Sequence, residues 1–273
     1  MNRPLKISKP DSLTGLKILV TRPEGNTEAL AESLRALGAE AIELPTIRFA
    51  PPESYALVDE ALKRLSRHEY QWCIFTSVNG VQFLWSRLSG LKYTNAIWQD
   101  VNLAAIGPAT AEAICSKGRD VHVVPEVFVA EEIAKGLGGV NGLRILLPRA
   151  DIARKALPKI LRESGAIVDE VAVYRTLPVQ IEKDRLAQIR KMFEKNEIDV
   201  ITFTSSSTVN SFIKLMTSAG LIKSQIQSAK MACIGPITEK TARELGLHVS
   251  IVAREHTIPG LIAKLIEELG SYE

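Results

Sequence analysis

The chain has 273 residues, of which 46% are hydrophobic and 24% charged. These proportions are close to the globular average and exclude a disordered or fibrous protein. The length exceeds the roughly 100–200 residues of one ordinary domain, so two domains are expected. The net charge of +3 gives no support for nucleic-acid binding through bulk charge, but it permits an anionic small molecule held by a few basic residues.

Cysteine usage and the absence of long apolar runs predict the compartment. The three cysteines are an odd number and have no C-x-x-C spacing, which indicates a reducing environment without a disulfide framework. The first 15 residues lack the apolar core of a signal peptide, and no apolar run approaches the roughly 18 residues of a membrane span. We therefore expect a soluble cytoplasmic protein that does not enter a membrane.

Strand-like and helix-like patterns alternate along the first half of the chain. Residues 17–21 form a short, β-branched and leucine-rich run typical of a buried strand. A helical pattern follows at 26–37, with Asn26 as its N-cap and Gly38 as its C-terminal stop. The next elements are predicted as a strand at 41–49, a helix at 55–65, a strand at 71–76, a helix at 79–88, a strand at 103–106, a helix at 109–116 and a strand at 120–124.

The second half repeats this order of patterns. Its predicted elements are a strand at 144–147, a helix ending before Gly165, a strand at 167–174, a helix at 184–194, a strand at 200–204 and a closing helix at 259–269. Strands that alternate with helices predict parallel sheets covered on both faces, and hence an α/β fold.

The two halves are related by an internal duplication. Phe75-Thr76-Ser77 recurs as Phe203-Thr204-Ser205, and Ile106-Gly107-Pro108-Ala109-Thr110 recurs as Ile234-Gly235-Pro236-Ile237-Thr238, each 128 residues later. Upstream of these motifs the offset is 127 residues, which relates Arg22, Gly38 and Arg48 to Arg149, Gly165 and Arg175. Each copy is far longer than a solenoid repeat, so we infer a duplicated half-protein.

Two extended segments predict the domain boundaries. Residues 39–49 and 166–176 run extended for about twice the usual 5–6 residues of a strand, in the same phase of the two copies. We infer that the chain crosses between domains there. One domain is then continuous, 47–175, and the other is discontinuous, 1–46 and 176–273. The alternative boundary is the glycine cluster at 136–142, where the two copies meet.

Several common functional sites are not indicated. The glycine cluster precedes a strand and lacks the spacing of nucleotide-binding loops, so it is interpreted as a flexible turn. The four histidines show no metal-ligand spacing with each other or with cysteines, which gives no support for a metal site. No G-x-S-x-G motif is present, so the serines are not indicated as hydrolase nucleophiles.

Candidate binding residues follow the predicted strands. Ser77 and Ser205 lie between a strand and a helix, and Thr110 and Thr238 fall in the first turn of the helices that follow Ile-Gly-Pro. In open α/β sheets, ligands bind beyond the carboxyl ends of strands, where helix N-termini favour anions. The alternatives are that the serines only cap their helices and that Ile-Gly-Pro is only a tightly packed helix start.

Basic and phenolic residues extend this candidate site. Arg22 and Arg149 follow the first strand of each copy, where an arginine offers bidentate binding to a carboxylate. Lys230 precedes the strand into Ile234, and Tyr174 ends one crossing segment, from which its phenol could reach a cleft between the domains. The alternatives are solvated loop arginines, a strand-flanking lysine and a tyrosine that packs the linker.

The ordered set of motifs resembles the uroporphyrinogen-III synthase family of tetrapyrrole biosynthesis. The resemblance covers roughly residues 16–269, and each motif is weak alone whereas the ordered set is specific. The matching motifs are Val20-Thr21-Arg22-Pro23, Phe75-Thr76-Ser77, Ile106-Gly107-Pro108-Ala109-Thr110, Leu147-Pro148-Arg149, Val173-Tyr174-Arg175-Thr176, Phe203-Thr204-Ser205 and Ile234-Gly235-Pro236-Ile237-Thr238.

The resemblance implies two flavodoxin-like domains joined by a two-stranded linker, with no cofactor and generally a monomeric state. It also implies the reaction, in a cleft between the domains. Linear hydroxymethylbilane loses its hydroxyl as water, ring D is inverted through a spiro intermediate, and the macrocycle closes as uroporphyrinogen III. A transient contact with the upstream hydroxymethylbilane synthase is left open.

The same resemblance suggests roles for individual residues. Tyr174 matches the tyrosine proposed to assist hydroxyl departure, as general acid or as holder of the acid water. Asn79 stands where some members carry a basic residue. The expected substrate-binding residues are Arg22, Ser77, Thr110, Arg149, Ser205, Lys230 and Thr238.

Two other functions remain open from the residues alone. A non-catalytic two-domain binder of an anionic small molecule fits the motifs at the strand ends equally well. A nucleotide-sugar enzyme with twin α/β domains would need a phosphate-binding glycine motif, which is missing.

Overall fold

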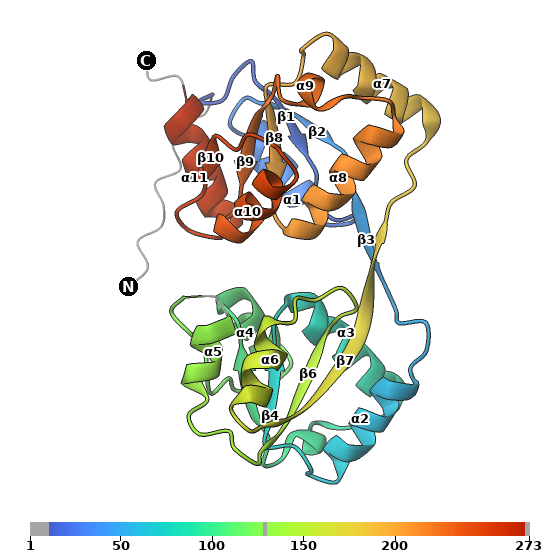
Figure 1. Ribbon diagram of the computed structural model, residues 1–273, viewed down its shortest axis with the longest axis vertical. Helices are drawn as coiled ribbons and strands as arrows, with labels where there is room; N and C mark the ends of the chain where they lie inside the picture. Colours follow the sequence, from blue (N-terminus) through green and yellow to red (C-terminus); the bar gives the residue numbers. More distant parts are fainter. Residues whose placement is uncertain (1–10, 128–129, 271–273) are drawn as a thin grey trace. The chain divides into compact units, whose positions relative to one another are not determined.

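The computed structural model describes residues 11–127 and 130–270 (Figure 1). It divides into two compact units: unit 1 comprises Met1–Phe49 and Leu177–Glu273, and unit 2 comprises Ala50–Thr176. The boundaries predicted from the sequence differ from these by three residues at the first crossing and by one at the second. None of the described helices is long and apolar enough to span a membrane.

Unit 1 contains a five-stranded sheet of order β10-β9-β8-β1-β2, with parallel pairing throughout. Alternate residues of β1 pack into two apolar clusters, Leu19 against α7 and α8, and Ile18 and Val20 against α1 and α11, so helices cover both faces. The strands are β1 (Lys17–Val20), β2 (Glu40–Glu43), β8 (Val200–Phe203), β9 (Lys230–Cys233) and β10 (Ile251–Val252). The helices are α1 (Glu28–Arg35), α7 (Lys183–Glu194), α8 (Ser206–Ser218), α9 (Lys223–Ile226), α10 (Pro236–Glu244) and α11 (Ile258–Leu269).

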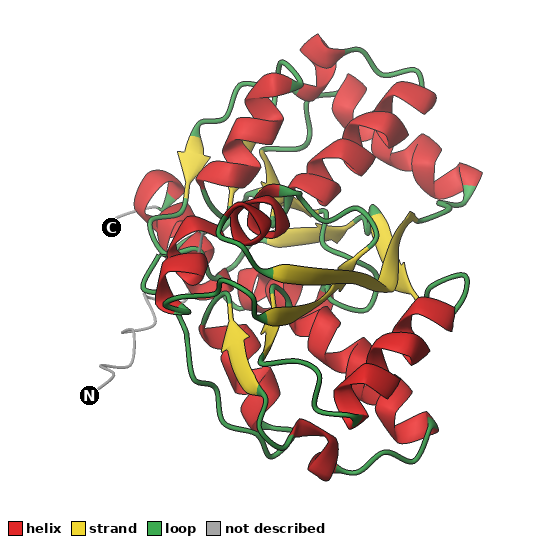
Figure 2. Ribbon diagram, turned by 60° about the horizontal axis from the view of Figure 1, so that its bottom comes forward, coloured by secondary structure: helices red, strands yellow, loops and turns green. Residues whose placement is uncertain are grey.

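The second sheet has the order β3-β7-β6-β4-β5 and belongs to unit 2, except that residues 47–49 of β3 and 177–178 of β7 fall in unit 1. Strands are yellow and helices red in Figure 2. Beyond β5, Val123 adds a single parallel bridge to Ala104. The strands are β3 (Ile47–Ala50), β4 (Trp72–Phe75), β5 (Asn102–Ala105), β6 (Arg144–Ala150) and β7 (Ile167–Pro178). The α-helices are α2 (Ala56–Ser66), α3 (Val78–Gly90), α4 (Pro108–Cys115), α5 (Ala130–Gly136) and α6 (Ala156–Glu163), and a 3₁₀ turn spans Asn95–Trp98.

The two sheets share one strand order when the copies of the duplication are aligned. The order β10-β9-β8-β1-β2 in unit 1 corresponds to Val123-β5-β4-β6-β7 in unit 2. Both have the 2-1-3-4-5 order of flavodoxin-like folds. The chain changes units after the second strand of each copy, so each unit combines two strands of one copy with three of the other.

The crossing segments differ from the predicted ones. The expected single strand at 41–49 is wrong: β2 and β3 are separated at 44–46, where Pro45 has no N–H to donate to a sheet. Thr46 in this break donates its hydroxyl to Thr21 O at 3.0 Å. The partner β7 is continuous and runs to Pro178, four residues beyond the prediction.

The structure also tests the predicted N-cap of α1, the predicted strand at 120–124 and the predicted helix ends at Gly38 and Gly165. The N-cap of α1 is Thr27 and not Asn26, although the Thr27 hydroxyl donates to Glu43 instead of capping the helix. The expected strand at 120–124 is reduced to the Val123 bridge. Gly38 and Gly165 end their helices as predicted, both at φ +86°, a conformation that side chains disfavour.

Candidate functional site

Four of the predicted site residues of unit 2 lie at the carboxyl ends of neighbouring strands. Ser77 follows β4, Thr110 lies in the first turn of α4 after β5, and Tyr174 is on β7. Arg149 lies inside β6 and does not follow it as predicted, because this strand runs to Ala150 and not to Leu147. Ser77 caps α3, accepting the Gly80 N–H at 3.0 Å, and its Oγ is also 3.1 Å from the phenol of Tyr174. The serine therefore caps its helix and contacts the tyrosine as well.

A β-bulge aims Tyr174 at this group. Arg149 pairs with Ala172 and Ala150 pairs with Tyr174, so Val173 is the extra residue of β7. Bulges of this kind interrupt the alternation of a strand and redirect the side chains that follow. Val173 and Tyr174 are consecutive yet both buried, with exposed fractions of 2% and 6%. The ring of Tyr174 stacks on Phe83 of α3, with centroids 5.3 Å apart.

The surroundings of Tyr174 keep its phenol protonated. Burial raises the pKa of Tyr174, whereas hydrogen bonds with Ser77 and Asn79 act in the opposite direction because they stabilise the phenolate. Burial is the larger effect, so at neutral pH the phenol is a hydrogen-bond and proton donor with partners ready to support its anion. Asn79 therefore supports the phenolate of Tyr174 by a hydrogen bond and not by a positive charge.

Arg149 is enclosed in an internal network. The residue is only 5% exposed, and its Nη1 donates to Glu170 Oε2 at 3.1 Å while Nη2 donates to Arg154 O at 2.5 Å. Lys155 also pairs with Glu170. Burial lowers the pKa of Arg149, and the nearby Glu170 carboxylate opposes that effect.

In unit 1, Arg22, Ser205 and Thr238 occupy the matching strand ends. Ser205 caps α8 in a reciprocal arrangement with Thr208, and Thr238 lies buried in the first turn of α10. The glycine of the Ile-Gly-Pro motif is required here, because a Cβ at Gly235 would lie 2.9 Å from the His256 ring.

Arg22 is half-buried just beyond β1. Burial lowers its pKa. Its Nε is enclosed and has no hydrogen-bond partner among residues 11–127 and 130–270. Arg22 therefore has no counter-ion in the part of the chain that the structure describes.

Lys230 is not brought together with these residues. It begins β9 and is exposed at the amino end of that strand, whereas Ser205 and Thr238 follow the carboxyl ends of β8 and β9. The pKa of Glu268 is lowered chiefly by a hydrogen bond from Lys264, and the charge of Lys230 adds to this effect.

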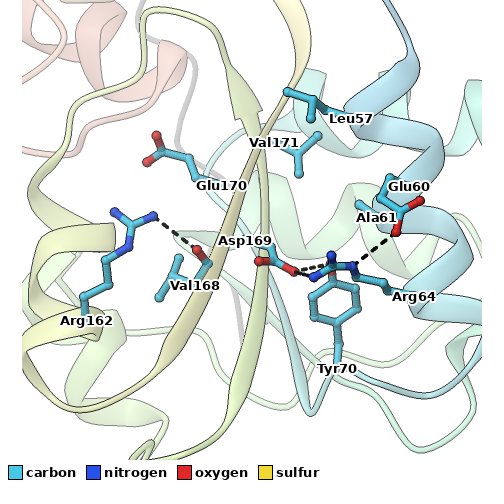
Figure 3. Close-up of a pocket in the computed structure, with 10 residues that line it drawn as sticks. All are labelled: Leu57, Glu60, Ala61, Arg64, Tyr70, Arg162, Val168, Asp169, Glu170 and Val171. Atoms are coloured by element: carbon cyan, nitrogen blue, oxygen red, sulfur yellow. Dashed lines mark hydrogen bonds and ion pairs between the residues drawn. The ribbon is translucent and has the colours of Figure 1, made fainter.

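A separate cavity of about 400 Å³ lies in unit 2 between α2, α6 and β7 (Figure 3). Asp169 accepts hydrogen bonds from Tyr70 at 2.7 Å, from Arg144 at 3.1 Å and from Arg64 at 3.3 Å. Arg144 begins β6, so this ion cluster belongs to the amino ends of the strands. Its partners satisfy one another, which is typical of a structural network.

Two residues of this site, Phe83 and Glu170, are not among those that the sequence motifs predict. Phe83 is matched in the other copy by Ser211, so the duplication gave no signal for it. Glu170 is matched by Glu43 at the 127-residue offset, a correspondence that could have identified it. Within the described residues, no group of three or more histidine, cysteine or acidic side chains could hold a metal ion.

Comparison with known proteins gives a consistent result. The family model described as Uroporphyrinogen-III synthase HemD matches residues 28–263. The chain is 35% identical to a uroporphyrinogen-III synthase of Synechococcus elongatus over 92% of this chain and 94% of that protein. It is 32% identical to the porphyrin biosynthesis protein HemD of Ruminiclostridium josui, over 93% of this chain and 49% of that protein.

Solved structures agree in fold. A mutant uroporphyrinogen III synthase from Thermus thermophilus aligns with a TM-score of 0.68 and 17% identity, over 93% of this chain and 99% of that one. The uroporphyrinogen-III synthetase of Helicobacter pylori aligns with a TM-score of 0.60 and 18% identity, over the same shares of each chain. From the family model and the extent of these similarities, the chain belongs to the uroporphyrinogen-III synthase family.

Proposed function

We propose that this protein performs the reaction for which its family is named, the cyclisation of linear hydroxymethylbilane to uroporphyrinogen III with loss of water and inversion of ring D. The observation that supports this most directly is the buried phenol of Tyr174, held between Ser77, Asn79 and Phe83 at the carboxyl edge of the unit 2 sheet. A protonated donor in fixed orientation suits the departure of a hydroxyl group.

In the proposed mechanism Tyr174 acts as general acid. The C–O bond of the hydroxymethyl group breaks as the phenolic proton passes to the oxygen, which leaves as water. The electron pair of the adjacent pyrrole nitrogen stabilises the resulting cation, while Ser77 and Asn79 stabilise the phenolate. The ring D carbon that already carries the bridge attacks this cation to form the spiro intermediate. Its bond to the original bridge carbon then breaks, the resulting cation on that bridge is captured by the other α-carbon of ring D, and this α-carbon loses the proton that restores the phenol.

The substrate carboxylates would be held by groups at the strand ends. Helices α3, α4, α8 and α10 begin there, and their first N–H groups favour anions. Ser205, Thr110 and Thr238 add hydroxyls, and Arg22 adds a positive charge. Lys230 is left out because it lies at the amino end of β9.

The test is to supply hydroxymethylbilane and to separate the type III from the type I isomer of the product. Spontaneous closure of this substrate gives the uninverted type I isomer, so type III above the enzyme-free background demonstrates the activity. Type I alone would refute the proposal and leave the binder of an anionic small molecule as the remaining function.

Other expectations stay predictions from the sequence. They are the cytoplasmic location, the monomeric state, the transient contact with hydroxymethylbilane synthase and the placement of the substrate between the two domains.

A further inference from the structure

The duplication supplies the same arginine and carboxylate to both units. Arg22 and Arg149 are matched at the 127-residue offset, and so are Glu43 and Glu170. Equivalent residues in equivalent folds would be expected to form equivalent ion pairs. The two units instead use these residues differently.

In unit 2 the carboxylate of Glu170 forms an ion pair with Arg149. Glu170 accepts from Arg149 at 3.1 Å and also pairs with Lys155, so the buried guanidinium is neutralised. The second Nη of Arg149 donates to the carbonyl of Arg154. Arg149 is only 5% exposed, and its Nε–H is enclosed without a partner among the described residues. A substrate carboxylate could therefore reach this guanidinium only if the internal pair with Glu170 opened, which is costly for a buried pair.

In unit 1 the carboxylate is occupied by other groups. Glu43 accepts from Thr27 at 2.6 Å and from Arg35 at 2.9 Å, both associated with α1. These bonds, that of Thr27 first, lower the pKa of Glu43 and keep it ionised. Arg22 has no ion pair or hydrogen bond with any described residue, and a half-buried guanidinium without a counter-ion favours binding of an external anion.

The network of Arg149 also leads to Tyr174. Its bond to Arg154 O fixes the loop between β6 and α6. At the start of that loop, Asp151 donates its N–H to Tyr174 O at 3.1 Å, and its carboxylate accepts the Thr176 N–H at 3.1 Å. Arg149 thus fixes one end of this loop. Asp151, at the other end, is hydrogen-bonded to β7 on both sides of Arg175.

We propose that the duplicated arginines have diverged: Arg22 binds a substrate carboxylate, whereas Arg149, locked by Glu170, is a positioning residue that holds the loop against Tyr174. This inference rests on the proposed function. It assigns different roles to Arg22 and Arg149, which the sequence motifs place together among the substrate-binding residues.

Steady-state kinetics of type III formation separates the two roles. Arg22→Gln should raise KM about 10-fold or more, as expected for loss of one charged hydrogen bond, and change kcat no more than about twofold. Arg149→Gln should lower kcat by about 10-fold and leave KM within about twofold, since misplacement of a reacting group reduces the rate more than binding. The combined Arg149→Gln and Glu170→Gln variant should match Arg149→Gln alone, because both residues act through one network.

Two further measurements do not depend on turnover. Fluorescence titration with uroporphyrin, an octacarboxylate probe, should show weaker binding in Arg22→Gln and unchanged binding in Arg149→Gln. Ultraviolet titration of the phenols, with Tyr174→Phe to assign the signal, should show a raised pKa for Tyr174 only in Arg149→Gln, because the positive charge of Arg149 lowers that pKa in the network. Arg190→Gln, which removes one positive charge from the exposed face of α7, is the matched control.

The proposal is overturned if Arg149→Gln weakens uroporphyrin binding as much as Arg22→Gln does, or if it leaves both kcat and the Tyr174 titration unchanged while its circular dichroism shows a folded protein. A wild-type enzyme that yields only type I would refute the proposed function, yet the uroporphyrin titration would still decide which arginine binds carboxylates.

Discussion

Tyr174 owes its position to several contacts that act on one side chain. The bulge at Val173 turns it inward, Phe83 covers its ring, and Ser77 and Asn79 meet its phenol. Each contact comes from a different kind of constraint, namely strand register, aromatic stacking and helix capping. The phenol is therefore oriented before any substrate is present, which is the condition for efficient proton transfer.

We expect Tyr174→Phe to slow type III formation by about 100-fold, at the low end of the contribution of a general acid, without abolishing it. The substrate closes spontaneously, so much of the enzyme's work is to hold its shape, and the variant retains that ability. The measurement is kcat with isomer analysis. Ser77→Ala should have a smaller effect, and complete loss of activity in a folded Ser77→Ala protein would contradict this picture.

Phe83→Leu tests the stacking contact. An aromatic pair contributes about 0.5–1.5 kcal/mol beyond its buried area, so loss of the ring should lower kcat by up to about 10-fold through looser positioning of Tyr174. Phe83→Tyr preserves the stack and should restore the rate. Equal rates for Phe83→Leu and wild type would show that stacking does not orient the phenol.

At the scale of elements, the two copies form the same hydrogen bond between a helix and the strand that follows it. Arg35 donates to Ala41 O and Arg162 donates to Val168 O, each at 3.1 Å and at matched positions of the duplication. In unit 1 this bond satisfies a carbonyl on the edge strand β2, where an unpaired carbonyl invites association with another strand. The glycines that end α1 and α6 are also matched and share the same φ.

Gly165→Ala should destabilise unit 2 by at least about 1 kcal/mol, because left-handed backbone disfavours a side chain. The added Cβ would also lie 2.1 Å from Asn141 Oδ1, so that side chain must move. Gly139→Ala is the matched control, since its Cβ meets nothing within 4 Å and its φ is not left-handed. Urea denaturation should give a lower midpoint for the first variant, and equal midpoints for both would contradict the argument.

At the scale of the whole molecule, the units can be followed separately. All three tryptophans, Trp72, Trp85 and Trp98, belong to unit 2, so tryptophan fluorescence reports the unfolding of that unit. Trp85 and Trp98 stack with centroids 4.7 Å apart beside Phe75, which makes their emission sensitive to packing. Unit 1 can be followed by the remaining change in far-ultraviolet circular dichroism.

Unit 2 should lose stability at alkaline pH. Burial and the hydrogen bond to Asp169 raise the pKa of Tyr70 above its ordinary value of 10, so the folded state keeps a proton that the unfolded state releases. The free energy of unfolding is then constant below pH 10 with respect to this group and falls above it, by up to about 1.4 kcal/mol per pH unit. Tyr70→Phe should reduce this slope by one proton in fluorescence-monitored urea titrations between pH 9 and 11. An unchanged slope would contradict the assignment.

The sequence by itself determined the repeat, the α/β class and the strand ends that precede the Thr-Ser and Ile-Gly-Pro motifs. These follow from short-range information: apolar runs set the strands, Gly38 and Gly165 end helices, and repeated motifs report the duplication. The same information placed Ser77, Ser205, Thr110 and Thr238 at helix starts, because capping involves neighbours along the chain.

Tertiary structure alone decided what depends on remote partners. The register between β6 and β7 created the bulge that aims Tyr174, and the choice of partner for Glu43 and Glu170 separated Arg22 from Arg149. Lys230 precedes its strand in the sequence, and the parallel pairing of β9 with β8 places it at the opposite edge of the sheet from Ser205 and Thr238. A sequence motif specifies which groups are present. Their pairing is set by strand register and by packing between segments 16 to 97 residues apart in the chain, neither of which local patterns encode.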